Sequence, residues 1–546
     1  MPPRLLHPDE YELVTRSSLD SHDSFDLDDA DFETHTSTSP NYLKSRPSLV
    51  SRLFSLIPFI RRQPRRGRSG EAAWKRKRQV GLRRRLSPRR LCSLLFAFSG
   101  IIFAVAFLTA IFRPSYSHPP AHYDTLRKKA LDTKDPGRGN PRNEKIFIAA
   151  SLYDRDGGLA RGRWGENVLQ LIQLLGKDNV FLSIYENDSG AEGEAALKEF
   201  EAKVESKKSI VYEAHLDLKD VPHITLADGS QRTKRIAYLA EVRNRALRPL
   251  DDRKSQRYDK LLYLNDVVFD PIDALQLLFS TNADENGISQ YRAACAVDFI
   301  NPFKFYDTYA TRDLEGFSMG VPFYPWFSNA GEAESRQDVL DQKDAVRVRS
   351  CWGGMVAFDA KFFQHPSPFD TDHNDRKKRE VNEQNMNSPA PRATSVVKFR
   401  AEADLYWDAS ECCLIHADIQ IPPYNSEKPI DTGIYMNPYV RVSYDTWTLS
   451  WLGTTRRFER LYSVVHRIIN AVAGMPRPNP RRTEVAGEEV EEKVWVPNDK
   501  NGGSYEMVKR QAGTGGFCGR RALQVMVPNP EKGQKNWESV PVPGGY

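Results

Sequence analysis

An uncharged apolar run of 22 residues, Leu91–Phe112, constrains this chain more than any other feature of its sequence. It holds no proline, and a helix of that length is long enough to cross a hydrocarbon core of about 30 Å. A buried helix of a large globular domain can have the same composition. The flanking charges favour a membrane span, because a dense basic block precedes the run and only Arg113 and Asp124 follow closely.

The basic block lies between Arg61 and Arg90 and contains fourteen Arg or Lys residues against one acid, Glu71. Such an excess of positive charge holds the N-terminal side of a span in the cytosol. A cleaved signal peptide is excluded because the run is too long and lies too far into the chain. Nucleic-acid binding is a poorer explanation of the same charges than anchoring beside anionic lipid. We therefore predict a single-pass type II membrane protein with a lumenal C-terminal part and no nucleic-acid partner.

Composition indicates four further segments of the chain, one before the apolar run and three after it. Residues 1–90 are predicted to be a disordered cytosolic tail that ends in the basic block. Residues 113–143 are predicted to be a lumenal stem, 144–475 the folded domain, and 476–546 a polar extension. Five cysteines follow the apolar run, so at least one of them has no partner within the chain.

Apolar segments of two kinds alternate in the first half of the folded domain. Continuous runs that indicate buried strands cover 145–151, 180–185, 209–213 and 260–264, and helical periodicity covers 166–175, 191–203 and 235–247. This alternation predicts an α/β fold with a parallel sheet. Ligands of such sheets bind beyond the carboxyl ends of the strands, which directs attention to 152–158, 186–190 and 265–269.

A further helical pattern covers residues 456–472 and places apolar side chains on one face, including Val464, Val465, Ile468 and Ile469. This face can dock on the protein core or lie on the membrane. We expect it to pack on the core.

The fourth predicted strand ends in Asn265-Asp266, and the helix before it carries Arg243 and Asn244. A carboxylate at a strand end suits a nucleoside diphosphate, because a divalent ion held there neutralises the charge of that leaving group. An arginine adds a bidentate clamp on phosphate. A single Asp in this position is as often a turn or cap residue.

Two other segments have both a functional and a structural interpretation. Glu186 and Asp188 follow the second strand, where an acidic loop can accept hydrogen bonds from a nucleoside or form an ordinary turn. Trp352-Gly353-Gly354 combines an indole face that suits a sugar ring with glycines that let a backbone approach a ligand. Core packing of Trp352 is an equally good interpretation.

His416 lies in the segment Ser410–Asp418, which also contains Cys412 and Cys413 in a predicted strand. Its imidazole can complete a metal site, and Mn²⁺ accepts such a ligand more readily than Mg²⁺ does. A single histidine is more often structural.

The ordered segments KIFIAASLYDRDGG, VFLSIYENDSG, EVRNRAL, YLNDVVF, AACAVDF, FYDTY, SCWGGMVAFDAKFF and FRAEADLYWDASECCLIHADI resemble the fungal capsule-associated α-1,3-mannosyltransferase family, glycosyltransferase family 69. The likeness runs from about residue 144 to 420. It implies a GT-A-like, Rossmann-like nucleotide-sugar-binding fold in a Golgi membrane enzyme that uses GDP-mannose, a divalent metal (Mn²⁺ or Mg²⁺) and a glycan acceptor.

Carried over position by position, the resemblance implies a role for each candidate. Asp266 would hold the donor metal together with His416. Arg243 and Asn244 would lie near the diphosphate, Glu186 and Asp188 near the nucleoside, and Glu411 near the transferred sugar. Asn265 would also contact the nucleotide sugar. Two departures stand out. The chain has Asn265-Asp266 where a full Asp-x-Asp is expected, and its nucleoside loop continues GAEGE.

We therefore predict transfer of mannose to a 3-hydroxyl with retention at the anomeric carbon. Retention needs either a carboxylate nucleophile or front-face attack assisted by the departing diphosphate. Glu411, Asp298 and Asp307 are the candidate carboxylates, and the sequence does not choose among them. A UDP-sugar donor, or a catalytically silent Golgi scaffold, is the alternative function.

Overall fold

The computed structural model describes residues 88–226, 228–252, 256–365, 396–421, 431–496, 503–527 and 535–543. The predicted cytosolic tail and most of its basic block lie outside them. Every site below belongs to the larger of two compact units, the one that contains Val105–Tyr546. The predicted span lies within α4 (Pro88–Phe112) and stays a prediction. Among the described residues, no helix is both long enough and apolar enough to span a membrane.

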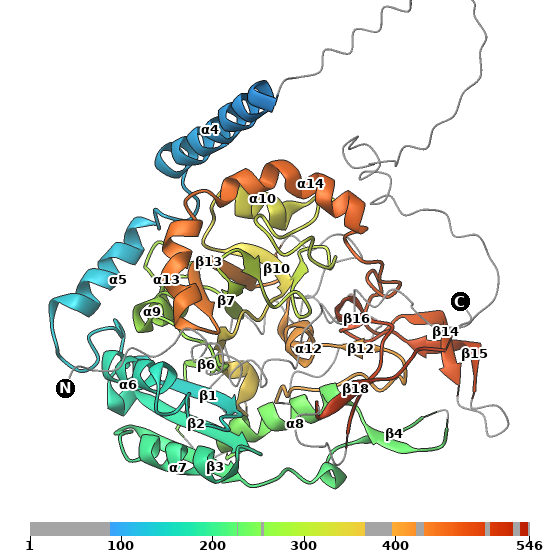
Figure 1. The fold of residues 1–546 in the computed structure, drawn as a ribbon. Coiled ribbons are helices and arrows are strands. Elements are labelled where there is room, and N and C mark those ends of the chain that lie inside the picture. The colour runs from blue at the N-terminus through green and yellow to red at the C-terminus, as the bar shows by residue number, and fades with distance from the viewer. Residues whose placement is uncertain are drawn as a thin grey trace, which may run out of the picture. The chain divides into compact units, whose positions relative to one another are not determined.

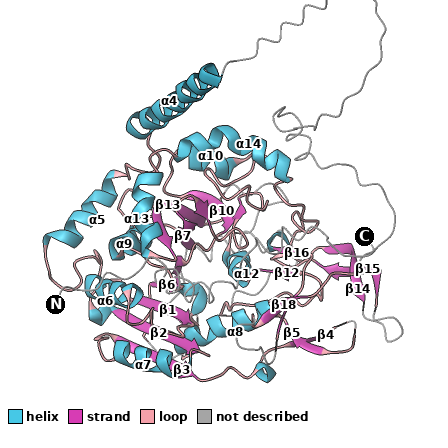
Figure 2. Ribbon diagram, viewed as in Figure 1, coloured by secondary structure: helices cyan, strands magenta, loops and turns pink. Residues whose placement is uncertain are grey.

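A ten-stranded mixed sheet forms the centre of the larger unit (Figures 1 and 2), in the order β3-β2-β1-β6-β11-β7-β13-β10-β9 with β8 paired to β7. Its strands are β1 (Ile146–Leu152), β2 (Val180–Asn187), β3 (Lys207–Glu213), β6 (Lys260–Leu264), β7 (Ala293–Asn301), β8 (Lys304–Phe305), β9 (Arg312–Asp313), β10 (Val346–Ser350), β11 (Met355–Asp359) and β13 (Ile434–Ser443). The helices are α5 (Ala121–Asp132), α6 (Arg163–Leu175), α7 (Gly190–Glu201), α8 (Arg235–Leu247), α9 (Pro271–Phe279), α10 (Glu334–Leu340), α12 (Glu411–Ile419), α13 (Thr446–Thr455) and α14 (Tyr462–Ala473).

Short elements complete the unit. The strands β4 (His223–Thr225), β5 (Gln231–Thr233), β12 (Asp408–Ala409), β14 (Glu489–Val496), β15 (Ser504–Gln511), β16 (Gly519–Arg520), β17 (Gln524–Met526) and β18 (Trp537–Ser539) form two-stranded sheets. Single 3₁₀ turns occur at Lys177–Asn179, Leu218–Asp220, Arg248–Asp251, Ala360–Phe363, Glu459–Leu461 and Gly516–Cys518.

The prediction of a parallel α/β sheet is confirmed for β3, β2, β1 and β6, which pair in parallel. Both faces of β2, β1 and β6 are covered, which explains their continuous apolar runs, whereas the edge strand β3 is partly exposed. In β1, Phe147 and Ala149 join the core layer that α8 covers, whereas Ile146, Ile148 and Ala150 join the layer under α6 and α9.

The second half of the sheet places more strand ends at the same edge. β11 is antiparallel to both β6 and β7, and β13 is parallel to β7. Hence β1, β2, β6, β7 and β13 all point the same way, and their carboxyl ends share one edge. Asp266 follows β6, Asp298 lies late in β7, and Tyr444 follows β13. The chain thus brings residues from three distant segments to the edge where such sheets bind ligands.

The expectation that the apolar face of residues 456–472 packs on the core is wrong. In α14, Val464, Ile468 and Val472 are 65–83% exposed, and the buried residues are the polar pair His466 and Asn470. The helix therefore attaches through its polar side.

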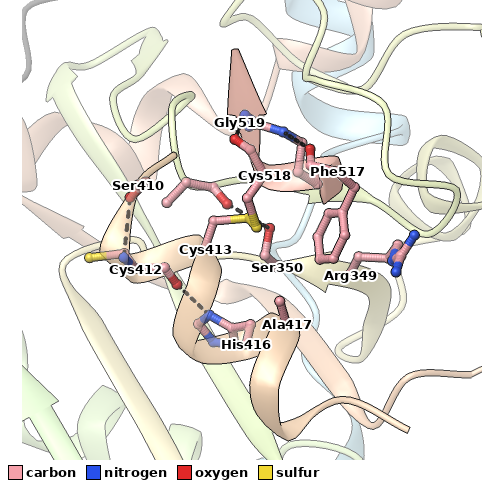
Figure 3. Close-up of a disulfide and its surroundings, with 12 residues drawn as sticks. Arg349, Ser350, Ser410, Cys412, Cys413, His416, Ala417, Phe517, Cys518 and Gly519 are labelled. Atoms are coloured by element: carbon pink, nitrogen blue, oxygen red, sulfur yellow. Dashed lines mark hydrogen bonds between the residues drawn. A yellow bond between two sulfur atoms is a disulfide. The ribbon is translucent and has the colours of Figure 1, made fainter. Parts of the chain in front are cut away.

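The C-terminal extension packs on the domain rather than trailing from it. β16 pairs with β12, and the Cys413–Cys518 disulfide joins the extension to α12 (Figure 3). The predicted strand at Cys412 and Cys413 is wrong. Both residues lie in the first turn of α12, because the Ser410 hydroxyl accepts a hydrogen bond from the Cys412 N–H at 3.2 Å and caps the helix. Cys412 is the unpaired cysteine among the five that follow residue 112.

Candidate functional site

The loop that carries Asp266 is held on both sides. The Asn265 N–H donates to the Gly354 carbonyl at 2.8 Å, and the Trp164 indole donates to the Asn265 carbonyl at 2.9 Å. Two residues beyond Asp266, Val268 and Ser443 exchange backbone hydrogen bonds of 2.7 and 3.1 Å. Asp266 is therefore presented half-buried from a fixed loop at the carboxyl edge of the sheet.

Asp298 is fully buried and joins Asp307 and Tyr444. Its Oδ1 accepts from the Asp307 N–H at 3.1 Å, and its Oδ2 accepts from the Tyr444 hydroxyl at 2.9 Å. Burial, then Asp298 and Glu411, raise the pKa of Asp307 to about 7. Burial, Asp298, Tyr306 and Asp266 together raise the pKa of Tyr444 well above its usual value.

Those electrostatic couplings show that all four catalytic candidates from the sequence gather in one place: Asp266, Asp298, Asp307 and Glu411. Their accessibility differs. Asp298 and Glu411 are fully buried, whereas Asp266 and Asp307 are half-buried. Only the latter two are open to a ligand.

Glu411 begins α12 and pairs with Arg243 of α8. The Arg243 Nε donates to Glu411 Oε1 at 2.8 Å, and its Nη1 donates to Asn265 Oδ1 at 3.2 Å. The other carboxylate oxygen of Glu411 is buried and has no hydrogen-bond partner. Arg243 thus joins the helix that carries Glu411 to the loop that carries Asp266.

Trp352 packs against Arg243 and is not open to a sugar. The Arg243 guanidinium lies 4.5 Å from the Trp352 ring centroid and is also enclosed by Tyr263 and Phe399. The indole Nε1 donates to Asn265 Oδ1 at 3.2 Å, and the side chain is 2% exposed. The predicted sugar platform is therefore wrong, and core packing is the correct interpretation.

The two glycines after Trp352 allow other parts of the chain, and not a ligand, to pack closely against the backbone. Both have positive φ, 57° and 66°. A Cβ on Gly353 would lie 2.0 Å from the Ala296 carbonyl oxygen, and one on Gly354 would lie 2.5 Å from a Val267 methyl. They let the turn between β10 and β11 pack against β7 and the Asp266 loop.

Asn244 also has a structural partner where a diphosphate contact was predicted. Its amide donates to the Phe399 carbonyl at 2.8 Å and accepts from the Phe399 N–H at 2.9 Å. Both ends of the side chain are used to hold the segment that encloses Arg243.

The predicted nucleoside residues differ in access. Glu186 is fully buried at the end of β2, and neither of its carboxylate oxygens completes a hydrogen bond. Burial raises the pKa of Glu186 to about 7, the nearby Ser189 hydroxyl lowers it, and Asp154 adds to the rise. Asp188 is about one-third exposed and contacts His215 Nδ1 at 2.6 Å. Of the pair, only Asp188 is open to a ligand.

His416 lies on the core side of α12. Its Nδ1 donates to the Cys412 carbonyl at 2.7 Å (Figure 3). Its Nε2 faces Cys295 Sγ at 3.8 Å. Cys295 is disulfide-bonded to Cys351, and burial lowers the pKa of His416 to about 4. Since the free lone pair faces a disulfide sulfur and the ring is fully buried, this geometry does not support a metal-ligand role for His416.

Sequence reasoning missed Arg235, Tyr306, Tyr309 and Tyr444. Arg235 is buried, its guanidinium donates to Gln524 Oε1 at 2.9 Å, and it stacks 4.7 Å from the Trp537 ring centroid. Burial lowers the pKa of Arg235 to about 10, against the opposing effects of Glu411, Tyr309 and Tyr306. The FYDTY segment was a usable signal for the two tyrosines. Nothing local marks Arg235, because the residues that hold it come from the C-terminal extension.

The residues at the edge fit a divalent metal. Asp266 and Asp307 each offer the hard, accessible oxygen donors that Mg²⁺ and Mn²⁺ accept, and Asp298 lies directly behind Asp307. Asp298 and Glu411 both raise the pKa of Asp307, which marks an excess of negative charge that a cation would offset.

Solved structures that match this chain include the following three, among others. A mannosyltransferase of Pyrobaculum calidifontis, solved with GDP-Man and Mn²⁺, is 11% identical, with 71% of this chain and 79% of that chain covered and a TM-score of 0.29. The glucosyl-3-phosphoglycerate synthase of Mycobacterium tuberculosis, solved with Mg²⁺ and UDP, is 10% identical, covers 73% and 97%, and has a TM-score of 0.27. The mannosyl-3-phosphoglycerate synthase of Rubrobacter xylanophilus is 12% identical, covers 73% and 94%, and has a TM-score of 0.24.

No curated protein matches the sequence. The family model described as Cryptococcal mannosyltransferase 1 matches residues 145–418, which comprise half of the chain and include all the site residues between Glu186 and His416. The chain therefore belongs to the Cryptococcal mannosyltransferase 1 family and is a hexosyltransferase.

Proposed function

We propose that this chain transfers mannose from GDP-mannose to a 3-hydroxyl of a lumenal glycan, with retention, on a GT-A-like fold. One observation carries the proposal. Asp266, Asp298, Asp307 and Glu411 converge at the carboxyl edge of the sheet beside the buried Arg243 and Arg235, in a chain of a mannosyltransferase family. The parallel half of the sheet forms the nucleotide side, and the mixed half forms the acceptor side.

Asp266 would hold the Mn²⁺ or Mg²⁺ ion, which when bound neutralises the diphosphate as the sugar bond breaks. Asp266 is suited to this because its loop is fixed by Gly354 and Ser443 and needs no reorganisation. Arg243 holds Asn265 and Glu411 in register and adds positive charge behind the diphosphate.

Accessibility separates the three carboxylates that the sequence offered for retention. Glu411 and Asp298 are fully buried, so a sugar cannot contact them in this arrangement. Asp307 is half-buried, and it is the candidate that would contact the transferred mannose. Glu411 and Asp298 act through Arg243, Tyr444 and Asp307 as positioning residues.

The same proposal places the enzyme in the Golgi membrane. Residues 91–112 would anchor the chain, with the basic block in the cytosol and the folded domain in the lumen. The acceptor would be a glycan of the cell wall, the capsule or a glycoconjugate.

The donor is tested with the full-length chain in detergent. Nucleotide release from GDP-mannose, UDP-glucose, UDP-galactose and UDP-xylose is measured with Mn²⁺, with Mg²⁺ and with a chelator. Metal-dependent release confined to GDP-mannose supports the proposal. Selective release of UDP overturns the choice of donor. Failure of every nucleotide and of Mn²⁺ to bind in calorimetry would favour a silent scaffold.

A further inference from the structure

The consecutive helices α13 and α14 carry seven large exposed apolar side chains, here together called the apolar face. In α14 they are Val464, Val465, Ile468, Ile469 and Val472, which are 43–83% exposed. Their spacing places them on one side of the helix. In α13 they are Trp447 and Trp451, which are 62% and 46% exposed with ring centroids 6.2 Å apart.

The apolar side chains of α14 are exposed because the helix is bonded to the protein through its opposite side. The His466 Nδ1 accepts from Arg336 at 2.9 Å, and its Nε2 donates to the Val321 carbonyl at 3.1 Å. The Asn470 Oδ1 accepts from the Val321 N–H at 2.7 Å. With its polar residues satisfied inside, α14 can only turn its aliphatic residues outward.

The exposed charges within the segment that forms α13 and α14 are of one sign. Between Thr446 and Arg477 the sequence has a single carboxylate, Glu459, which is buried and paired with Arg441 at 2.7 Å. Arg457 and Arg467 are exposed. Aliphatic residues, tryptophans and arginines without an exposed acid are the composition of a helix that lies in a lipid interface.

The chain also fixes the apolar face next to the end of the predicted anchor. The Ser115 N–H donates to the Arg456 carbonyl at 3.2 Å, and the Arg456 Nη1 donates to the Tyr116 carbonyl at 3.0 Å. Tyr116 is buried. Arg456 lies between α13 and α14. Its partner Ser115 is three positions after Phe112, which limits the distance between Ser115 and the end of α4 to about 10 Å.

We propose that α13 and α14 lie on the surface of the lipid bilayer, with the apolar face buried among the headgroups and upper acyl chains. This inference rests on the proposed anchoring by residues 91–112, because the bond between Ser115 and Arg456 brings the face to whichever surface the anchor leaves. The bilayer contact would fix the orientation of the catalytic domain, so that its site opens at a set height above the membrane.

The test uses the full-length chain reconstituted in phospholipid vesicles whose acyl chains carry a nitroxide quencher. Single cysteines are introduced in a Cys92→Ser background and labelled with a fluorophore, since Cys412 is buried and the other four cysteines form disulfides. Ile468→Cys reports on the apolar face. Met507→Cys is the matched control, because Met507 is equally exposed, at 65%, on β15. Ile102→Cys reports on the anchor.

Quenching at 468 and 102 with none at 507 supports the proposal. Quenching at 102 without quenching at 468 overturns it while leaving the anchor in place. Absence of quenching at both positions overturns the docking and the anchoring together, and equal quenching at 507 and 468 overturns it as non-specific contact. A second variant, Val464→Asp with Val472→Asp, should remove quenching at 468 and leave it at 102. Unchanged quenching at 468 in that variant also contradicts the proposal.

Discussion

Arg243 and Glu411 lie 168 residues apart in the chain and form a buried ion pair of 2.8 Å beneath the candidate site. The arginine also donates to Asn265, the residue before Asp266. One guanidinium therefore couples the helix α12, the helix α8 and the end of β6. The position of Asp266 depends on this contact even though Arg243 itself is nearly inaccessible.

Arg243→Lys should lower kcat by about 10- to 100-fold, because an ammonium group cannot bond Glu411 and Asn265 in the same fork. KM for the donor should change less. The control is Arg245→Lys, since Arg245 lies on the same helix but pairs with Glu213 and Glu241 instead of Glu411 and Asn265. Steady-state kinetics on both variants distinguish loss of the Arg243 contacts from a general effect on α8. Equal losses in both would show a general effect on α8 instead.

Asp307→Asn should lower kcat by about 100-fold or more, because the one accessible candidate for contact with the transferred sugar loses its charge. Asp313→Asn is the matched control: burial also raises the pKa of Asp313 to about 7, but its carboxylate accepts N–H bonds from Glu315 and Phe317 within its own turn. Single-turnover kinetics measure the chemical step. A normal rate in Asp307→Asn would leave front-face attack by the acceptor, without a protein nucleophile, as the route to retention.

Glu186→Gln should stabilise the protein at pH 8 by about 3 kcal/mol and have little effect at pH 4. Burial raises the pKa of Glu186 from 4.5 to about 7, so the folded protein binds a proton that the unfolded chain releases between those values. Stability from this group is thus complete below pH 4.5 and is lost as the pH rises to 7. Denaturant unfolding at the two pH values measures the difference. A gain of equal size at both would show that the ionisation of Glu186 is not its cause.

Replacing Cys413 and Cys518 together by alanine should destabilise the fold by about 2–4 kcal/mol, because the disulfide closes a loop of 105 residues. A second measurement is the protease sensitivity of the C-terminal extension. It should rise, while the parallel half of the sheet stays resistant to the protease. Replacing Cys295 and Cys351 is the comparison, since that disulfide lies inside the domain. Unchanged proteolysis of the extension would contradict its role in holding α12.

The parallel half of the fold could be predicted because its signals are local. The bounds predicted for β6 and α8 agree with the structure, and the continuous apolar runs of β1 and β2 follow from helices on both faces. The order of the remaining strands depends on pairing between distant segments, which no local pattern encodes. The structure also shows that β11 enters the sheet antiparallel between β6 and β7.

The candidate residues at strand ends were predicted better than those in aromatic or polar segments. Asp266 follows a strand whose end could be predicted, and it therefore lies at the carboxyl edge of the sheet. Trp352 and Asn244 have the composition of a ligand site, but their side chains contact Arg243 and Phe399. α14 was misassigned for a related reason. Helical periodicity shows that one face is apolar but not which face meets the protein, and the bonds of His466 and Asn470 decide that.

The most direct test of the account is metal-dependent release of GDP from GDP-mannose by full-length protein and by Asp266→Asn. The matched control is Asp270→Asn, four residues on, where the carboxylate caps α9 by accepting from the Ile272 N–H and asparagine caps equally well. The account predicts Mn²⁺-dependent release by the parent and by Asp270→Asn, and its loss in a folded Asp266→Asn protein. Normal release by Asp266→Asn would contradict the assignment of the site at the end of β6.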